Sequence, residues 1–249
     1  MSSHTIPTPT ASTAGEPAPA LPDSTRTIRT AAVVAGAALM LMAVTAAFGN
    51  LAAVERLVTP DDAARTARDI AGSEGLFRLG VTALYVAALL DVVVAWALLR
   101  VFSPVSRDLS RLAAWFRLAY SAVFLVSLSE LAGIPRLLSS GTYAAVLTPE
   151  QRQGEVMLKI DTFGDIWFAG LILFGIHLAL VGYLAYRSGF VPRLIAVLLV
   201  IAGAGYVYDS LVRLFTEGPH FAVASVTFLG EFLLGLWLLI RGRRISPSA

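Results

Sequence analysis

Residues 174–213 read FGIHLALVGYLAYRSGFVPRLIAVLLVIAGAGYVYDSLVR, two long apolar runs joined by a short break. Each run contains ionisable side chains, which apolar segments normally exclude. His177 lies near the middle of the first run, and Asp209 and Arg213 lie four residues apart in the second, on one face of a helix. The stretch therefore predicts a hairpin of two membrane helices with polar groups inside the bilayer.

The composition of the whole chain supports a membrane protein. Of its 249 residues, 57% are hydrophobic and only 14% are charged, whereas soluble domains contain roughly 25% charged residues. A span of about 20 apolar residues crosses a hydrocarbon core of about 30 Å, and several such runs follow one another. We expect one all-α domain in the cell membrane, a bundle of six transmembrane helices.

The expected spans are 30–48, 79–99, 112–134, 166–186, 190–215 and 221–240. Residues 1–25 are rich in Ser, Thr, Pro and Ala and cannot bury enough apolar surface to order themselves, which predicts a disordered tail. The transmembrane domain then covers 26–244, and 245–249 form a C-terminal tail.

Caps and prolines predict where helices begin and end. Thr59 followed by Pro60 and two acids predicts the start of a short loop helix that ends near Gly72. The capping box that begins at Thr148 predicts a second short loop helix. Pro135 is expected to close the third span. Ser188-Gly189 and Pro192 predict a tight turn between the fourth and fifth spans.

Basic residues predict the orientation, because Lys and Arg accumulate in cytoplasmic loops. With six spans, one side of the membrane receives most of the arginines that flank the spans, namely Arg26, Arg29, Arg100, Arg107, Arg111, Arg187, Arg193, Arg241, Arg243 and Arg244. We therefore expect both termini in the cytoplasm and the two short loop helices outside.

Several kinds of chemistry are disfavoured. The chain has no cysteine, which excludes disulfides and thiolate chemistry. It has no HExxH motif or clustered histidines, and no GxSxG motif, so we expect no cofactor, no metal site and no serine nucleophile. Its basic residues lie at span ends rather than in one stripe, so we expect no nucleic-acid partner.

The sequence resembles the integral membrane proteins of bacteria grouped as domain of unknown function 4386. The motifs that carry the likeness are DAARTARDIAGSEGLFRL at 62–79, FGIHL at 174–178, the hairpin from Gly182 to Arg193, the Gly203 to Leu211 region, and Gly230-Glu231 followed by LWLL at 236–239. The resemblance implies a fold and a membrane location, and it implies no activity.

Ionisable residues inside spans are the candidate site. Asp91, His177 and Glu231 fall near the middle of their spans, and Arg117 lies in the cytoplasmic half. The other candidates fall toward the outer ends, namely Arg78, Glu130, Asp209 and Arg213, along with Asp165. This distribution predicts an aqueous vestibule that opens to the outside and has the central trio as its floor.

Three functions remain open at this level. The first is binding or transport of a small molecule or lipid through the vestibule. The second is a structural or regulatory subunit in which the charges only tie helices together, Asp209 with Arg213, and Asp91 or Glu231 with Arg117 or Arg78. The third, which we rank below the others, is a membrane-embedded enzyme.

Overall fold

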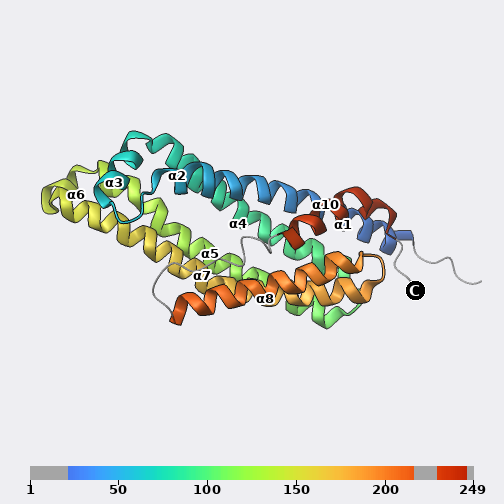
Figure 1. Ribbon diagram of the computed structural model, residues 1–249. Helices are drawn as coiled ribbons and strands as arrows, with labels where there is room; N and C mark the ends of the chain where they lie inside the picture. The colour runs from blue at the N-terminus through green and yellow to red at the C-terminus, as the bar shows by residue number, and fades with distance from the viewer. Residues whose placement is uncertain (1–21, 216–228, 246–249) are drawn as a thin grey trace, which may run out of the picture.

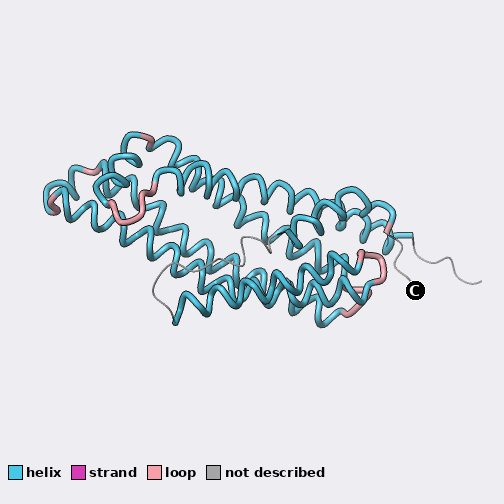
Figure 2. The backbone as a smooth tube through the Cα atoms, viewed as in Figure 1, coloured by secondary structure: helices cyan, strands magenta, loops and turns pink. Residues whose placement is uncertain are grey.

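The computed structural model describes residues 22–215 and 229–245, and within them the chain is helical and contains no strand (Figures 1 and 2). Five helices are long and apolar enough to cross a membrane: Thr25–Leu57, Glu74–Phe102, Arg107–Ser139, Pro149–Ser188 and Arg193–Arg213. The elements in chain order are α1 (Pro22–Ala47), η1 (Phe48–Val54), α2 (Glu55–Leu57), α3 (Ala63–Gly72), α4 (Glu74–Phe102), α5 (Arg107–Ser139), α6 (Gly141–Val146), α7 (Pro149–Ser188), α8 (Arg193–Phe215), α10 (Leu229–Arg241) and η2 (Gly242–Arg244).

The helices form an elongated bundle (Figure 1). Helix α4 packs against α1 on one side and α5 on the other, and α7 packs between α5 and α8. Helix α10 packs against α1 and α8. The short helices α2, α3 and α6 lie at one end of the bundle, and the start of α1, the α7–α8 turn and η2 lie at the other (Figure 1).

The outer surface of the bundle is apolar along the long helices. Large hydrophobic side chains such as Val44, Leu89, Val126 and Leu194 are 59% to 69% exposed. A water-soluble surface rarely carries so many of these side chains in continuous bands. The bundle surface therefore suits contact with lipid, and the buried core combines large apolar side chains with alanines and a few polar residues.

The first loop helix is confirmed, but its cap is one turn later than expected. Helix α3 begins at Ala63, and the Asp62 side chain accepts a hydrogen bond of 2.8 Å from the backbone N–H of Arg65. The backbone N–H of Thr59 instead donates a hydrogen bond to the Thr66 hydroxyl, and that hydroxyl donates one to the carbonyl oxygen of Thr59. Asp61, the residue after Pro60, has a φ of 60°, which is not a helical conformation. Pro60 is therefore not the first residue of the helix.

Two expected helix boundaries are wrong. Pro135 does not close the third span, because α5 continues through it to Ser139. The capping box at Thr148 is present, with Pro149 at the first helical position, yet it opens the 40-residue helix α7 rather than a separate short helix. The short helix of this connection is α6, six residues long, which begins just after Ser140.

The hairpin between α7 and α8 is confirmed. Gly189 has φ of 70°, the left-handed conformation that favours glycine at the end of a helix. The two helices then run back along each other and cross where Gly175 faces Gly203. A side chain on either glycine would meet the other residue's carbonyl oxygen, so both must lack a Cβ for this approach.

Some predictions fall on residues outside the described ranges. The turn at 217–219 and the first eight residues of the sixth expected span belong to them, and so do most of the two expected tails. The described part of the sixth expected span is helical and belongs to α10, which runs over thirteen residues, Leu229–Arg241. Residues 22–25, expected in the N-terminal tail, are already helical in α1.

Candidate functional site

The side chain of Arg117 is fully buried at the centre of the bundle, where five helices meet. Its Nη2 atom lies 2.6 Å from Oδ1 of Asp91 on α4, and its Nη1 atom lies 2.6 Å from Oε1 of Glu231 on α10. Nη1 also lies 3.0 Å from Nε2 of His177 on α7. Nη2 lies 3.5 Å from the sulfur of Met42 on α1. We call these five residues the Arg117 cluster.

The chemistry of arginine fixes the protonation of His177. A guanidinium only donates hydrogen bonds, so Nε2 of His177 must accept the one from Arg117. Its Nδ1 atom lies 2.8 Å from the carbonyl oxygen of Ala113, which only accepts, so Nδ1 must carry the proton. His177 is therefore a neutral imidazole that links α5 and α7, and both of its nitrogens are already in use.

Aromatic rings cover the cluster. The Arg117 guanidinium lies 5.3 Å from the centre of the Phe174 ring, a cation–π contact. That ring in turn packs against Tyr120 at 4.7 Å and Tyr206 at 5.4 Å. A cavity of about 10 Å³ touches His177, which is room for at most one water molecule. The Arg117 cluster is thus nearly closed to solvent.

The charges of the cluster do not balance. One guanidinium faces two carboxyl groups, and the imidazole is neutral. The two ion pairs also differ, because the contact with Glu231 is a hydrogen bond, whereas the contact with Asp91 is close but lacks the alignment of one. Nε of Arg117 has no hydrogen-bond partner among the described residues. Arg117 is therefore the cation on which both carboxyl groups depend.

The structure brings together Asp91, His177, Glu231 and Arg117, and it separates the other predicted residues from them. Arg78 pairs with Glu74 at 2.7 Å, and Glu130 pairs with Lys159 at 2.8 Å. Arg213 pairs with Asp165 of α7 at 3.1 Å and lies over the Phe168 ring. Asp209 itself is fully buried in α8.

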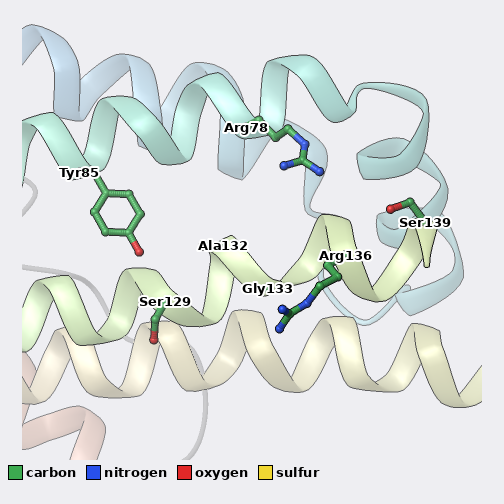
Figure 3. Close-up of a pocket in the computed structure, with 7 residues that line it drawn as sticks. All are labelled: Arg78, Tyr85, Ser129, Ala132, Gly133, Arg136 and Ser139. Atoms are coloured by element: carbon green, nitrogen blue, oxygen red, sulfur yellow. The ribbon is translucent and has the colours of Figure 1, made fainter. Parts of the chain in front are cut away.

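A cavity of about 530 Å³ lies between α4 and α5, toward the end of the bundle that carries α3 and α6. It is lined by Arg78 and Tyr85 of α4 and by Ser129, Ala132, Gly133, Arg136 and Ser139 of α5. In Figure 3, Arg78 and Tyr85 point from α4 toward α5. We call it the α4–α5 cavity.

The α4–α5 cavity does not have the Arg117 cluster as its floor. None of the cluster residues lines it. Its deepest residue on α4 is Tyr85, and six residues of helix, about 9 Å, separate Tyr85 from Asp91. The expected single vestibule is therefore two separate features, a closed charged cluster and a polar cavity nearer the end of the bundle.

Comparisons with known proteins place the chain in a family. The family model described as "Domain of unknown function (DUF4386)" matches residues 34–242. The chain belongs to the DUF4386 family. A relative from Archaeoglobus fulgidus, named "Uncharacterized protein", is 32% identical over 166 residues, which cover 67% of this chain and 85% of the relative. No solved structure matches the chain.

Sequence reasoning missed the α5 side of the cavity in this DUF4386 chain. Arg136 was assigned to a loop because Pro135 was expected to end the span. A signal was present, however, since Ser129, Gly133 and Arg136 recur at helical spacing and share one face with Ser139. Met42 was missed because a methionine in an apolar span looks like ordinary packing.

No group of three or more potential metal ligands occurs among the described residues. The carboxylates and imidazole of the Arg117 cluster are instead turned toward the guanidinium. The Arg117 cluster links helices α1, α4, α5, α7 and α10 through contacts with one cation. The α4–α5 cavity, in contrast, is lined by cations and hydroxyl groups and has the volume of a ligand site.

Proposed function

We propose that this DUF4386 protein crosses the membrane six times, with both termini in the cytoplasm, and binds an anionic amphiphile in the α4–α5 cavity. The observation that carries the proposal is that two arginines and several hydroxyl-bearing residues line one cavity of about 530 Å³. That volume lies within the range of about 300–1,000 Å³ typical of small-molecule sites.

The polar residues of the cavity suit a carboxylate or phosphate. Arg136 has no ion pair among the described residues, so its guanidinium is available to an anion. Arg78 is held by Glu74 through both Nε and Nη2, which leaves Nη1 to donate. The Tyr85 hydroxyl can donate to the same ligand, whereas Ser129 and Ser139 already donate to the carbonyl oxygens of Val126 and Pro135 and only add polar surface.

The surroundings of the cavity favour an amphiphile over a small inorganic anion. Ala132 adds an apolar side chain to the wall between the serines, and the neighbouring outer face of the bundle exposes apolar side chains such as Val86 and Val126. A ligand that enters between two membrane helices meets hydrocarbon as well as arginine. A single-chain fatty acid or alkyl phosphate combines the two properties that the cavity offers.

Thermal unfolding of the purified protein in mild detergent tests the proposal with palmitate and dodecyl phosphate, and with dodecanol as the uncharged probe. We expect the two anions to raise the unfolding temperature and dodecanol to leave it unchanged. Replacement of Arg136 by glutamine should remove the effect of the anions. Arg68→Gln is the matched control, since Arg68 is exposed at the same end in α3 and does not line the cavity. Equal shifts in the Arg136→Gln and wild-type proteins would refute the proposal.

A second candidate function rests on the Arg117 cluster. Its nearly closed ion pairs favour a structural role for these charges, in which the chain is a scaffold or regulatory subunit of a larger membrane assembly. In that case a protein partner should co-purify stably in mild detergent, and the Arg136→Gln protein should retain it.

A further inference from the structure

A second arginine-lined cavity, of about 570 Å³, lies at the opposite end of the bundle, where α1 begins and η2 ends. Arg26 and Arg29 of α1 and Arg243 of η2 line it, together with Thr25, Thr30, Val33 and Val34. We call it the α1–η2 cavity. Neither the Arg117 cluster nor the α4–α5 cavity includes any of these residues.

The three arginines are brought together by tertiary contact. Nε of Arg29 donates a hydrogen bond of 2.9 Å to the carbonyl oxygen of Ile245, 216 residues later in the chain. This bond ties the segment after α10 to the start of α1 and holds Arg243 beside Arg26. The cavity is therefore a feature of the folded chain and not of one basic sequence run.

The arginines of this cavity lack the aromatic or acidic partners that four other arginines at the same end possess. Arg100, Arg187 and Arg193 each lie over an aromatic ring, at 5.9, 6.0 and 5.6 Å from the ring centre. Arg111 forms an ion pair with Asp108. Among the described side chains, no acid pairs with Arg26, Arg29 or Arg243. Three guanidinium groups thus share one cavity without a counter-charge from the described chain.

The wall of the cavity changes from cationic to apolar along one stripe of α1. Arg26, Arg29, Thr30, Val33 and Val34 follow at i, i+3, i+4, i+7 and i+8, which is one face of a helix. Arg26 and Val33 are about 10 Å apart along the helix axis. A ligand in this cavity contacts arginine and threonine at the end of the bundle and valine further along α1, toward the middle of the bundle.

We propose that the α1–η2 cavity binds the phosphate of an anionic phospholipid, with an acyl chain along Val33 and Val34. Guanidinium groups bind phosphate oxygens through paired hydrogen bonds, and the Thr25 hydroxyl can donate to the same group, whereas Thr30 already donates to the carbonyl oxygen of Arg26. Free phosphate carries the same charge, but it has no acyl chain that could contact Val33 and Val34. Basic pockets between membrane helices are a known form of site for anionic headgroups. This inference does not depend on the α4–α5 cavity.

The test is retention of lipid by the full-length protein in mild detergent, where no charged bilayer surface attracts arginines in general. The protein is incubated with phosphatidylglycerol, phosphatidylcholine or inorganic phosphate, and bound lipid is counted by native mass spectrometry. We expect retention of phosphatidylglycerol and not of phosphatidylcholine. The variant with both Arg26→Gln and Arg243→Gln should bind phosphatidylglycerol about a hundredfold more weakly, at about tenfold for each arginine.

Two controls distinguish the cavity from net charge and from the other site. Arg107→Gln removes an exposed arginine at the same end that does not line the cavity, and it should retain phosphatidylglycerol like the wild type. Arg136→Gln should also retain it, because that residue belongs to the α4–α5 cavity. Wild-type retention by the double variant, equal losses in the Arg107→Gln protein, or displacement of phosphatidylglycerol by millimolar inorganic phosphate would each overturn the proposal.

Discussion

Arg117 of α5 and Asp91 of α4 lie 2.6 Å apart with side chains that are 0% and 4% exposed, at the point where five helices converge. A second carboxylate, Glu231, lies at the same distance from the other end of the guanidinium. One cation therefore lies between two acids inside the bundle. The consequences for stability follow from which of the three charges is removed.

Removal of Arg117 should damage the fold far more than removal of Asp91. Arg117→Gln leaves two buried carboxylates without a cation, which should cost about 3–5 kcal/mol of unfolding free energy. Asp91→Asn leaves the Arg117–Glu231 pair, a neutral combination, and should cost clearly less. The unfolding temperature in detergent measures both, with Arg65→Gln as a control because the Arg65–Asp69 pair is exposed. An equal or larger loss for Asp91→Asn would contradict this account of the cluster.

His177 should be neutral, with its proton on Nδ1. We expect nitrogen chemical shifts of the neutral Nδ1–H tautomer in protein labelled on histidine, because Nε2 accepts from Arg117 and Nδ1 donates to Ala113. The signal is assigned by its loss in a His177→Asn variant. Arg117→Gln, in samples that remain folded, should change the tautomer balance. A wild-type signal from a charged imidazole at neutral pH would be incompatible with the geometry.

The crossing of α7 and α8 should depend on Gly203. In Gly203→Ala, the added methyl group would meet the Gly175 carbonyl and the backbone N–H of Ala179, so the helices must separate and stability should fall. Gly154→Ala is the matched control, since Gly154 lies in α7 with nothing near its side-chain position. That change should stabilise the helix by up to about 1 kcal/mol. Comparison of the two unfolding temperatures checks the prediction, which fails if both variants change in the same direction.

The proposed six spans can be checked by cysteine labelling, because the chain has no cysteine of its own. An impermeant maleimide applied to intact cells should label Ser140→Cys in the α5–α6 connection. It should not label Ser106→Cys in the α4–α5 connection or Ser248→Cys at the C-terminus until the cells are opened. Labelling of Ser248→Cys in intact cells would indicate an odd number of spans.

Much of the fold could be predicted from local signals. Gly189, Thr148 and the α3 segment behave largely as their local sequence predicts, because caps and turns are decided by neighbouring backbone groups. Pro135 shows the limit of that reasoning. A proline inside a helix removes one hydrogen bond, and α5 continues past it nonetheless, since Ile134 and Leu137 on either side are buried against the bundle.

The candidate site was predicted in its members more than in its pairing. Asp91, His177, Glu231 and Arg117 could be singled out because charge is costly inside an apolar span. Whether Asp91 and Glu231 pair with Arg117 or with Arg78 stayed open, since helical spacing shows which face a residue occupies but not the rotation of that face relative to other helices. Arg117 was expected in the cytoplasmic half of its span as a partner of Asp91 or Glu231, and the structure shows it between both acids.

The sequence alone determined that this chain is an all-helical protein with long apolar helices, and which polar residues lie within them. Hydropathy, caps and turn residues are local properties, and each acts over a few positions of the chain. Only the tertiary structure decided that Arg213 pairs with Asp165, that Arg117 holds Asp91 and Glu231 together, and that the arginines at the two ends line separate cavities. The partners in these ion pairs lie 26 to 114 residues apart. Helix packing brings them together, and close glycine contacts such as Gly175 with Gly203 permit that packing.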